Sequence, residues 1–207
     1  MISPLILIKQ LCHRYTSAVI GVLLKGLFLS TSLLATMLFQ TSVSAMEIQF
    51  SSQQQLSAAK ISNDTVMGGI SSSEIENDAA LDQPIFSGNV SLANNGGFAS
   101  MEYRINTSIP TSSSVKLTVM GDGKRYQLRF KTPELSFGEA YVANFDTTAG
   151  EQTEHTFIPA DFKSQFRGRS VNAPALVFAN VDRVGLLIAD KQAGNFSLTL
   201  GSIDFQQ

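Results

Sequence analysis

The chain has 207 residues, of which 43% are hydrophobic and 15% charged, so it is long enough for one globular domain with a substantial core. Its formal charge of −2 gives no basic field of the kind that binds nucleic acid, and we expect no nucleic-acid partner. The single cysteine, Cys12, excludes an intrachain disulfide framework and a thiolate zinc site.

The first 45 residues have the pattern of a signal peptide. They hold three basic residues and no acidic one, an apolar stretch over residues 26–39, and the small residues Val43-Ser44-Ala45 as a cleavage site. We therefore expect a leader over residues 1–45 and a domain over residues 46–207, exported to the periplasm or secreted.

Cleavage of this leader would change the charge of the protein. All 17 acidic residues and 12 of the 15 basic residues follow residue 45, so the remaining 162 residues carry a net charge of −5. The alternative is an uncleaved membrane anchor, because residues 18–39 are long enough to span a bilayer if Lys25 reaches its surface. The protein would then meet the membrane through this segment alone.

From residue 46 onward the sequence repeats short runs in which apolar and polar residues alternate between Gly, Asn, Asp, Ser or Pro. Alternation places successive side chains on opposite faces and is typical of half-buried strands. The expected strands are 46–51, 85–92, 97–105, 115–120, 125–130, 140–145, 155–158, 183–189 and 196–205. Residues 52–60 are the most helical segment, with a turn or two at most. Nine or ten short strands predict an all-β domain of two packed sheets, a β-sandwich or jelly roll.

The clearest pair of strands is 115–119 and 126–130, which Gly121-Asp122-Gly123-Lys124 connects. Glycine and aspartate provide the positive-φ positions that a tight turn needs. The pattern predicts a hairpin whose two strands lie side by side in one sheet.

Six motifs occur in a fixed order along residues 50–205. They are 63–71 (NDTVMGGIS), 86–88 (FSG), 94–100 (NNGGFAS), 121–126 (GDGKRY), 162–169 (from Phe162 to FRGR) and 184–196 (VGLLIADKQAGNF). Together they resemble the complex I intermediate-associated protein 30 family. The resemblance implies a galactose-binding-like β-sandwich and a role like that of the mitochondrial members, which are assembly factors for respiratory complex I with no established catalytic activity. The mitochondrial members act from the matrix side, which corresponds to the bacterial cytoplasm, whereas the leader predicts export.

The first glycine motif, Met67-Gly68-Gly69-Ile70-Ser71, has two interpretations. Adjacent glycines let a partner approach the backbone, but they also make a tight turn. The polar residues on either side exceed what a turn requires. Residues 94–97 have the same two interpretations, with the turn favoured. The candidate binding residues here are Asp64, Met67, Gly68, Gly69 and Ser71.

Four charged residues form the second group of candidates. Asp122 either holds a ligand or belongs to an Asp-Gly turn. Arg125 alternates with Arg129 and Lys131, a pattern that favours the solvated polar face of a sheet. Arg167 and Arg169 follow aromatic residues and suit a carboxylate, a phosphate or an acidic protein surface, although ion pairs within the domain are the alternative.

The sequence offers little catalytic chemistry. His155 is the only histidine after residue 45, and the nucleophile elbow, dinucleotide and P-loop motifs are missing. We expect no catalytic residue, metal site or cofactor. The leading hypothesis is a non-enzymatic domain that binds a protein partner, such as a subunit of a membrane complex. The second is a carbohydrate-binding module that stacks a sugar on Tyr103, Tyr126 or Tyr141. The third is an enzyme on an envelope polymer, with two close carboxylates.

Overall fold

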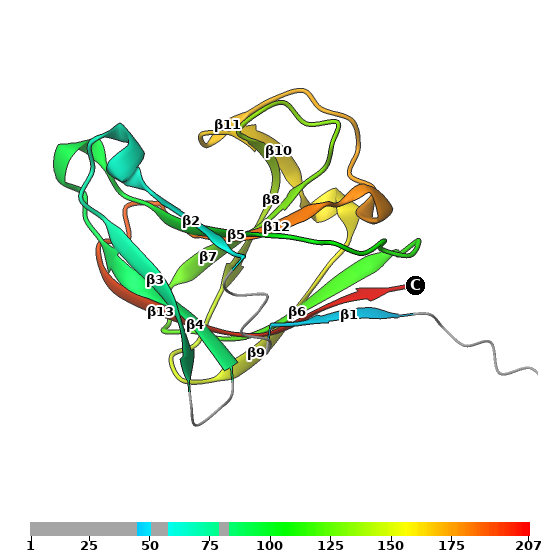
Figure 1. Ribbon diagram of the computed structural model, residues 1–207, viewed down its shortest axis with the longest axis horizontal. Helices are drawn as coiled ribbons and strands as arrows, with labels where there is room; N and C mark the ends of the chain where they lie inside the picture. The colour runs from blue at the N-terminus through cyan, green and yellow to red at the C-terminus, as the bar shows by residue number, and fades with distance from the viewer. Residues whose placement is uncertain (1–44, 51–57, 79–82) are drawn as a thin grey trace, which may run out of the picture. The chain divides into compact units, whose positions relative to one another are not determined.

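Alternating side chains build two antiparallel β-sheets that pack face to face (Figure 1). The computed structural model describes residues 45–50, 58–78 and 83–207, which belong to one compact unit. The expected leader, apart from Ala45, and most of the helical turn expected at 52–60 lie outside the described residues.

The first sheet has six strands. Five are ordered β3-β4-β13-β6-β9, and β1 also pairs with β13. The strands are β1 (Met46–Gln49), β3 (Ser72–Asp78), β4 (Gln83–Val90), β6 (Ser114–Met120), β9 (Gln152–Phe157) and β13 (Gly194–Gln206). The long strand β13 therefore lies at the centre of this sheet.

The second sheet has seven strands in the order β11-β10-β8-β7-β12-β5-β2. They are β2 (Lys60–Asn63), β5 (Ala99–Arg104), β7 (Arg125–Lys131), β8 (Glu139–Asp146), β10 (Lys163–Phe166), β11 (Arg169–Ser170) and β12 (Arg183–Ile188). Short 3-10 helices lie in the connections: η2 (Asp64–Met67), η3 (Ala93–Asn95), η4 (Pro159–Asp161) and η5 (Phe178–Asn180).

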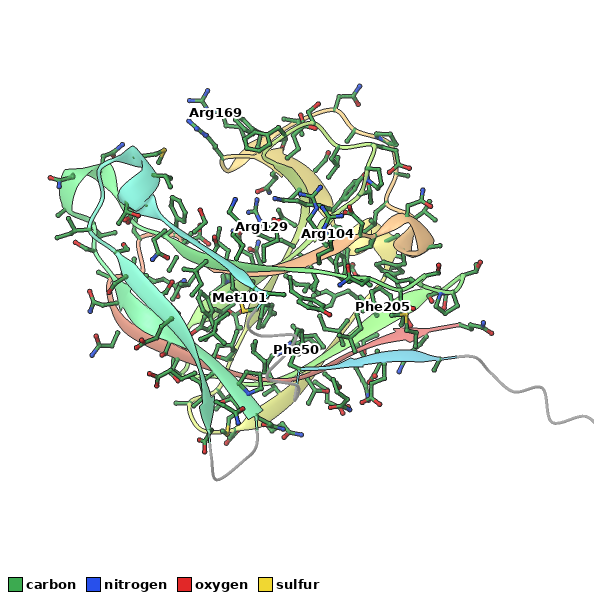
Figure 2. The ribbon with its side chains drawn as sticks, in the orientation of Figure 1. Phe50, Met101, Arg104, Arg129, Arg169 and Phe205 are labelled. Atoms are coloured by element: carbon green, nitrogen blue, oxygen red, sulfur yellow. The ribbon has the colours of Figure 1, made fainter. Side chains whose placement is uncertain are left out.

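The hydrophobic core fills the space between the two sheets. The seven-stranded sheet contributes Met101, Leu128 and Leu186, and the six-stranded sheet contributes Leu117 and Leu198, all buried. Edge-to-face and tilted aromatic contacts join the layers, as between Phe130 and Phe205, whose ring centres are 5.9 Å apart. Figure 2 shows Phe50, Met101 and Phe205 in this inner space.

The predicted all-β sandwich is confirmed, and each expected strand overlaps an observed one. The described residues contain thirteen strands, more than the nine or ten expected. The prediction missed β2, β3, β10 and β11. Strand β3 has the sequence SSEIEND and lies at a sheet edge, where polar side chains face water and hide the alternation.

The predicted hairpin between 115–119 and 126–130 is wrong. Strand β6 pairs with β9 and β13 in one sheet, whereas β7 pairs with β8 and β12 in the other. The turn at residues 121–124 therefore carries the chain from one sheet to the other. The apolar residues of both strands do point into the core, but they approach it from opposite sides.

Candidate functional site

Asp64, at the start of η2, is fully buried. Its carboxylate accepts hydrogen bonds from the backbone amides of Ser71 at 2.9 Å and Gly97 at 2.6 Å, and from the Ser71 hydroxyl. A longer contact of 3.4 Å comes from the amide of Phe98. Burial alone raises the pKa of Asp64, but these hydrogen bonds outweigh it and hold the pKa below its ordinary value. The carboxylate thus joins two loops that are distant in sequence.

Two glycines pack directly against this carboxylate. A Cβ atom on Gly69 would lie 2.3 Å from Asp64 Oδ1, and one on Gly96 would lie 2.4 Å from Oδ2. Gly68 has a different role. Its φ of +91° lies in the left-handed region and ends η2, and a Cβ atom there would meet no atom within 4 Å. Asp64, Gly69 and Ser71 therefore hold the loops together. Their expected direct contact with a partner is not supported, since all three are buried.

Much of the outer surface of these loops is apolar. Val66, Met67, Ile70 and Leu92 expose 73%, 51%, 62% and 43% of their surface. The Asn94 side chain donates to the Gly68 carbonyl at 3.1 Å and so links the two loops at the surface. We call Val66, Met67, Gly68, Ile70 and Leu92 the paired-loop corner; Figure 1 shows η2 and η3 beside each other there.

Asp122 lies in the crossing between the sheets, where it binds other parts of the protein. Its carboxylate accepts the Tyr126 hydroxyl at 2.9 Å and the backbone amides of Lys124 at 3.1 Å and Ser197 at 3.0 Å. Ser197 belongs to one sheet and Tyr126 to the other. Burial, and then the nearby charge of Asp122, raise the pKa of Tyr126 far above its ordinary value. The Asp-Gly turn interpretation of Asp122 therefore holds, with the added function of joining the sheets.

Arg167 and Arg169 lie at the tip of the β10–β11 hairpin. Arg167 and Gly168 have φ values of +50° and +76°, as a tight turn requires, and the Arg167 guanidinium lies 5.3 Å from the centre of the Phe166 ring. Both arginines are exposed. Neither makes an ion pair with a carboxylate of the described residues. Both guanidinium groups are therefore available for the predicted binding role.

The face of the seven-stranded sheet that points away from the core is basic. Strand register places on it Lys60, Arg104, Arg125, Arg129, Lys131, Lys163 and Arg183, which we call the outer face. These are seven of the 12 basic residues that follow residue 45. Figure 2 shows Arg104 and Arg129 on this side of the sheet, opposite Met101 and Phe205.

Most cations of the outer face have carboxylate partners. Arg125 forms a two-pronged ion pair with Asp146 at 2.7 and 2.8 Å. Lys131 and Arg183 contact Glu102, and Arg104 and Arg183 contact Asp182 at 3.7 and 3.3 Å. The solvated-face interpretation of Arg125 is therefore supported. Arg129, Lys60 and Lys163 differ, because within the described part of the chain no carboxylate lies at ion-pair distance from them.

We examined the described residues for groups that an enzyme of the expected kinds would use. His155 packs against the Phe145 ring at 5.0 Å, and its Nε2 atom lies 3.0 Å from the Thr153 hydroxyl. Burial lowers the pKa of His155, and Asp146 opposes that shift. A surface groove beside β10 is lined by residues such as Tyr141, Ser164 and Leu176, with no carboxylate among those that line it. Within the described ranges, no group of three or more His, Cys, Asp or Glu residues could hold a metal ion. In the same ranges no helix has the length and apolar character to cross a membrane.

The rings expected to stack a sugar are turned inward. Tyr103, Tyr126 and Tyr141 expose 9%, 0% and 3% of their surface. Their side chains come from the core-facing positions of β5, β7 and β8. The stacking role expected for these tyrosines is therefore wrong, because the apolar alternation of their strands places them in the core.

The comparison of the sequence with protein families decides its membership. The profile of the complex I intermediate-associated protein 30 family matches residues 48–200, which is nearly the whole described domain. The chain belongs to this family. Within it, the motif around Asp64 and the motif at 94–100 form a single structural unit. No curated protein sequence matched the chain as a close relative.

Several solved structures share the fold. An agarase has a TM-score of 0.52 at 10% identity, and an exo-beta-agarase 0.50 at 8% identity. Each alignment covers 79% of this chain but only 24% and 26% of the agarases. A family 11 carbohydrate-binding module from Clostridium thermocellum, in complex with a beta-1,3-1,4-mixed-linked tetrasaccharide, has a TM-score of 0.47 at 12% identity, covering 81% of this chain and 91% of that one. At such low identity the similarity to the two agarases shows the fold alone, a galactose-binding-like β-sandwich.

Sequence reasoning missed several residues of these surfaces. Val66, Ile70 and Leu92 are apolar residues in loops, and their exposure follows only from the burial of Asp64 beneath them. Arg104 and Arg183 occupy polar positions of their strands, which is a visible signal. That these strands lie near one another could be known only from the sheet order.

Proposed function

We propose that this protein is a non-enzymatic binding domain for a protein partner and that the paired-loop corner is its main contact surface. One observation carries the proposal: a buried carboxylate fixes two loops, much of whose outer surface is apolar. Exposed apolar groups lower the free energy when they are covered, and a fixed surface loses little entropy on binding. Half of the large hydrophobic residues that are exposed in the described chain lie at this corner.

The family supports a partner that is itself a protein, since its name refers to association with an intermediate of complex I. We further propose that the partner is a subunit of a membrane complex. Arg167 and Arg169 would add a second contact, with carboxylates of that partner. No observation of the site favours the carbohydrate alternative, because the tyrosines expected to hold a sugar are buried.

The corner is tested with two matched double variants of the tagged full-length protein. Met67→Ser with Ile70→Ser removes apolar groups that are 51% and 62% exposed, and Ile158→Ser with Val177→Ser removes groups that are 49% and 51% exposed elsewhere. Proteins captured from cells are quantified by mass spectrometry. We expect a partner that the wild type and the control recover alike, and that the corner variant recovers about tenfold less or worse. Equal recovery by both variants would overturn the corner as the contact surface.

The leader leads to a proposal about location: the domain is exported, and its partner is an envelope protein. Cell fractionation with N-terminal sequencing tests it. We expect a mature chain beginning at Met46 in the periplasm. A cytoplasmic protein with an intact N-terminus would contradict export and would place the domain on the side where the mitochondrial relatives act.

A further inference from the structure

The outer face of the seven-stranded sheet is a surface that the paired-loop corner does not use. It carries seven basic residues, although the domain that follows residue 45 has a net charge of −5. The carboxylates on the same face by strand register are Glu102 and Asp146, and Asp182 beside it contacts Arg104 and Arg183. A local excess of positive charge on an acidic domain attracts anionic groups to that face.

Arg129 lies in the middle of this face. On its neighbouring strands the directly paired residues are Val142 of β8 and Gly185 of β12, neither of which is charged. Its Nη1 atom donates to Gln127 Oε1 at 3.1 Å. A guanidinium has five N–H donors in a planar fork that matches a carboxylate. Among the described residues this bond is the one hydrogen bond that the Arg129 side chain makes, so most of its donors are available.

Arg129 is also partly removed from water. Burial lowers its pKa below the ordinary value for arginine, and the charge of Glu102 opposes that shift. An anion that bound there would find a cation already stripped of much of its hydration, which strengthens a charge-assisted hydrogen bond. The other central cations, Lys131 and Arg183, have Glu102 as a partner and are less available.

The cations form rows that cross the sheet. One row runs from Lys163 on β10 through Arg129 to Lys60 on β2, with the carboxylate of Glu102 on β5 next to Lys60. The next row holds Lys131, Arg183 and Arg104 on adjacent strands. Six strands about 4.8 Å apart span about 24 Å, the length of about seven residues of extended chain. We propose that the outer face binds an extended acidic segment of the partner protein, with Arg129 holding one of its carboxylates by paired hydrogen bonds.

A peptide fits this surface better than an acidic sugar chain. The uncharged residues between the cations are Gln127, Gly185 and Leu187, together with the buried Ala140 and Val142, so no aromatic ring faces outward at these positions. Sugars usually bind on exposed aromatic rings, and the nearby tyrosines point into the core. The inference rests on the proposed function only in taking the partner to be a protein, because it concerns a different surface.

The test uses a fluorescein-labelled heptaglutamate peptide, with a heptaglutamine peptide of equal length as its control. Binding to the full-length protein is measured by fluorescence anisotropy at low ionic strength. We expect the wild type to bind heptaglutamate and not heptaglutamine. Arg129→Gln should weaken binding about tenfold or more, whereas Lys116→Gln, which removes a charge from the other sheet, should change it less than about twofold. Equal effects of the two variants would mean unspecific attraction and would overturn the proposal, as would an absence of binding to the wild type.

Three further arms make the result specific. Arg129→Lys keeps the charge but loses the planar fork. Its affinity for heptaglutamate should therefore be clearly lower than that of the wild type, while its melting temperature should be similar. The corner variant Met67→Ser with Ile70→Ser should bind heptaglutamate like the wild type, even though it loses the captured partner. Loss of peptide binding in that variant would move the site to the corner and overturn the inference. Displacement of the peptide by a galacturonate oligosaccharide at lower concentrations than by unlabelled heptaglutamate would overturn the assignment to a protein segment.

Discussion

The carboxylate of Asp64 accepts a hydrogen bond from the backbone amide of Gly97 at 2.6 Å, across 33 residues of sequence. With Ser71 as its second partner, this carboxylate connects three segments: the start of η2, the residues before β3 and the residues before β5. The two glycine motifs are therefore halves of one structure. Its Asp64 and Ser71 are used inside the protein, whereas the apolar Val66, Met67 and Ile70 face outward.

The first prediction concerns Asp64→Asn. An amide keeps the size of the carboxylate but removes its charge and turns an NH2 group toward the amide of Ser71 or Gly97. We expect the free energy of unfolding to fall by about 2–4 kcal/mol, as for a buried group that loses charged hydrogen bonds. Chemical denaturation measures the loss. The exposed Asp146→Asn serves as control and should leave stability little changed.

The hydrogen bonds of the Asp64 carboxylate also predict that stability depends on pH. Because the folded-state pKa of Asp64 lies below its ordinary value of 3.8, its contribution to stability is complete above that pH and is lost as the pH falls toward the folded-state pKa. The difference in unfolding free energy between wild type and Asp64→Asn should be constant from neutral pH down to about pH 5 and shrink below about pH 4. A difference that stayed constant down to pH 2 would contradict the role of the ionised carboxylate.

The glycines around Asp64 predict a contrast between two substitutions. Gly69→Ala places a methyl group 2.3 Å from Asp64 Oδ1 and should cost about 2–3 kcal/mol by overpacking. Gly150→Ala meets no atom within 4 Å, although its φ is +73°, so it should cost only the backbone strain of about 1 kcal/mol. Thermal melting of the two variants measures the contrast. A larger loss for Gly150→Ala would show that the loops can open around Asp64.

Asp122 and Tyr126 predict coupling between the two sheets. Tyr126→Phe removes one buried hydrogen bond and should destabilise the fold by about 1 kcal/mol. Asp122→Ala also leaves the amides of Ser197 and Lys124 without their acceptor and should cost more. In a double-mutant cycle the two effects should be clearly non-additive, because the residues share a hydrogen bond. Additive effects would contradict a direct link.

The hairpin tip predicts a change in binding without a change in stability. Arg167→Gln with Arg169→Gln removes two exposed charges that have no ion pair in the described chain, so the melting temperature should stay near that of the wild type. Recovery of the protein partner should fall and become less sensitive to salt. Lys124→Gln with Lys191→Gln removes two charges elsewhere and is the matched control. Unchanged recovery in the arginine variant would exclude this hairpin from the interface.

The strands could be predicted because alternation depends only on neighbouring residues. Leu117 and Leu128 are apolar at every second position whether their strands share a sheet or face each other across the core. The pattern therefore contains no information about pairing. That is why the strands containing these two residues were expected to form a hairpin and instead lie in different sheets.

The site was less predictable because its residues act over long distances in sequence. Asp64 is a polar residue in a glycine-rich loop, the usual composition of both a binding loop and a turn. Only the position of Gly97 against its carboxylate shows that Asp64 is an internal link. Arg129 similarly has the same polar strand position as Arg125, and the difference between them depends on which carboxylate lies opposite: Asp146 faces Arg125, whereas Val142 faces Arg129.

The central position of β13 has a consequence for when the protein can fold. This strand holds β4 on one side and β6 on the other, and β1 also pairs with its end, yet it comes from residues 194–206. While the chain is being synthesised, the six-stranded sheet lacks its centre until these residues leave the ribosome. The two layers then have to close after translation of this strand, in a step dominated by distant contacts and therefore slow. Until that moment the apolar strands are open to chaperones, which can hold the chain in an unfolded form.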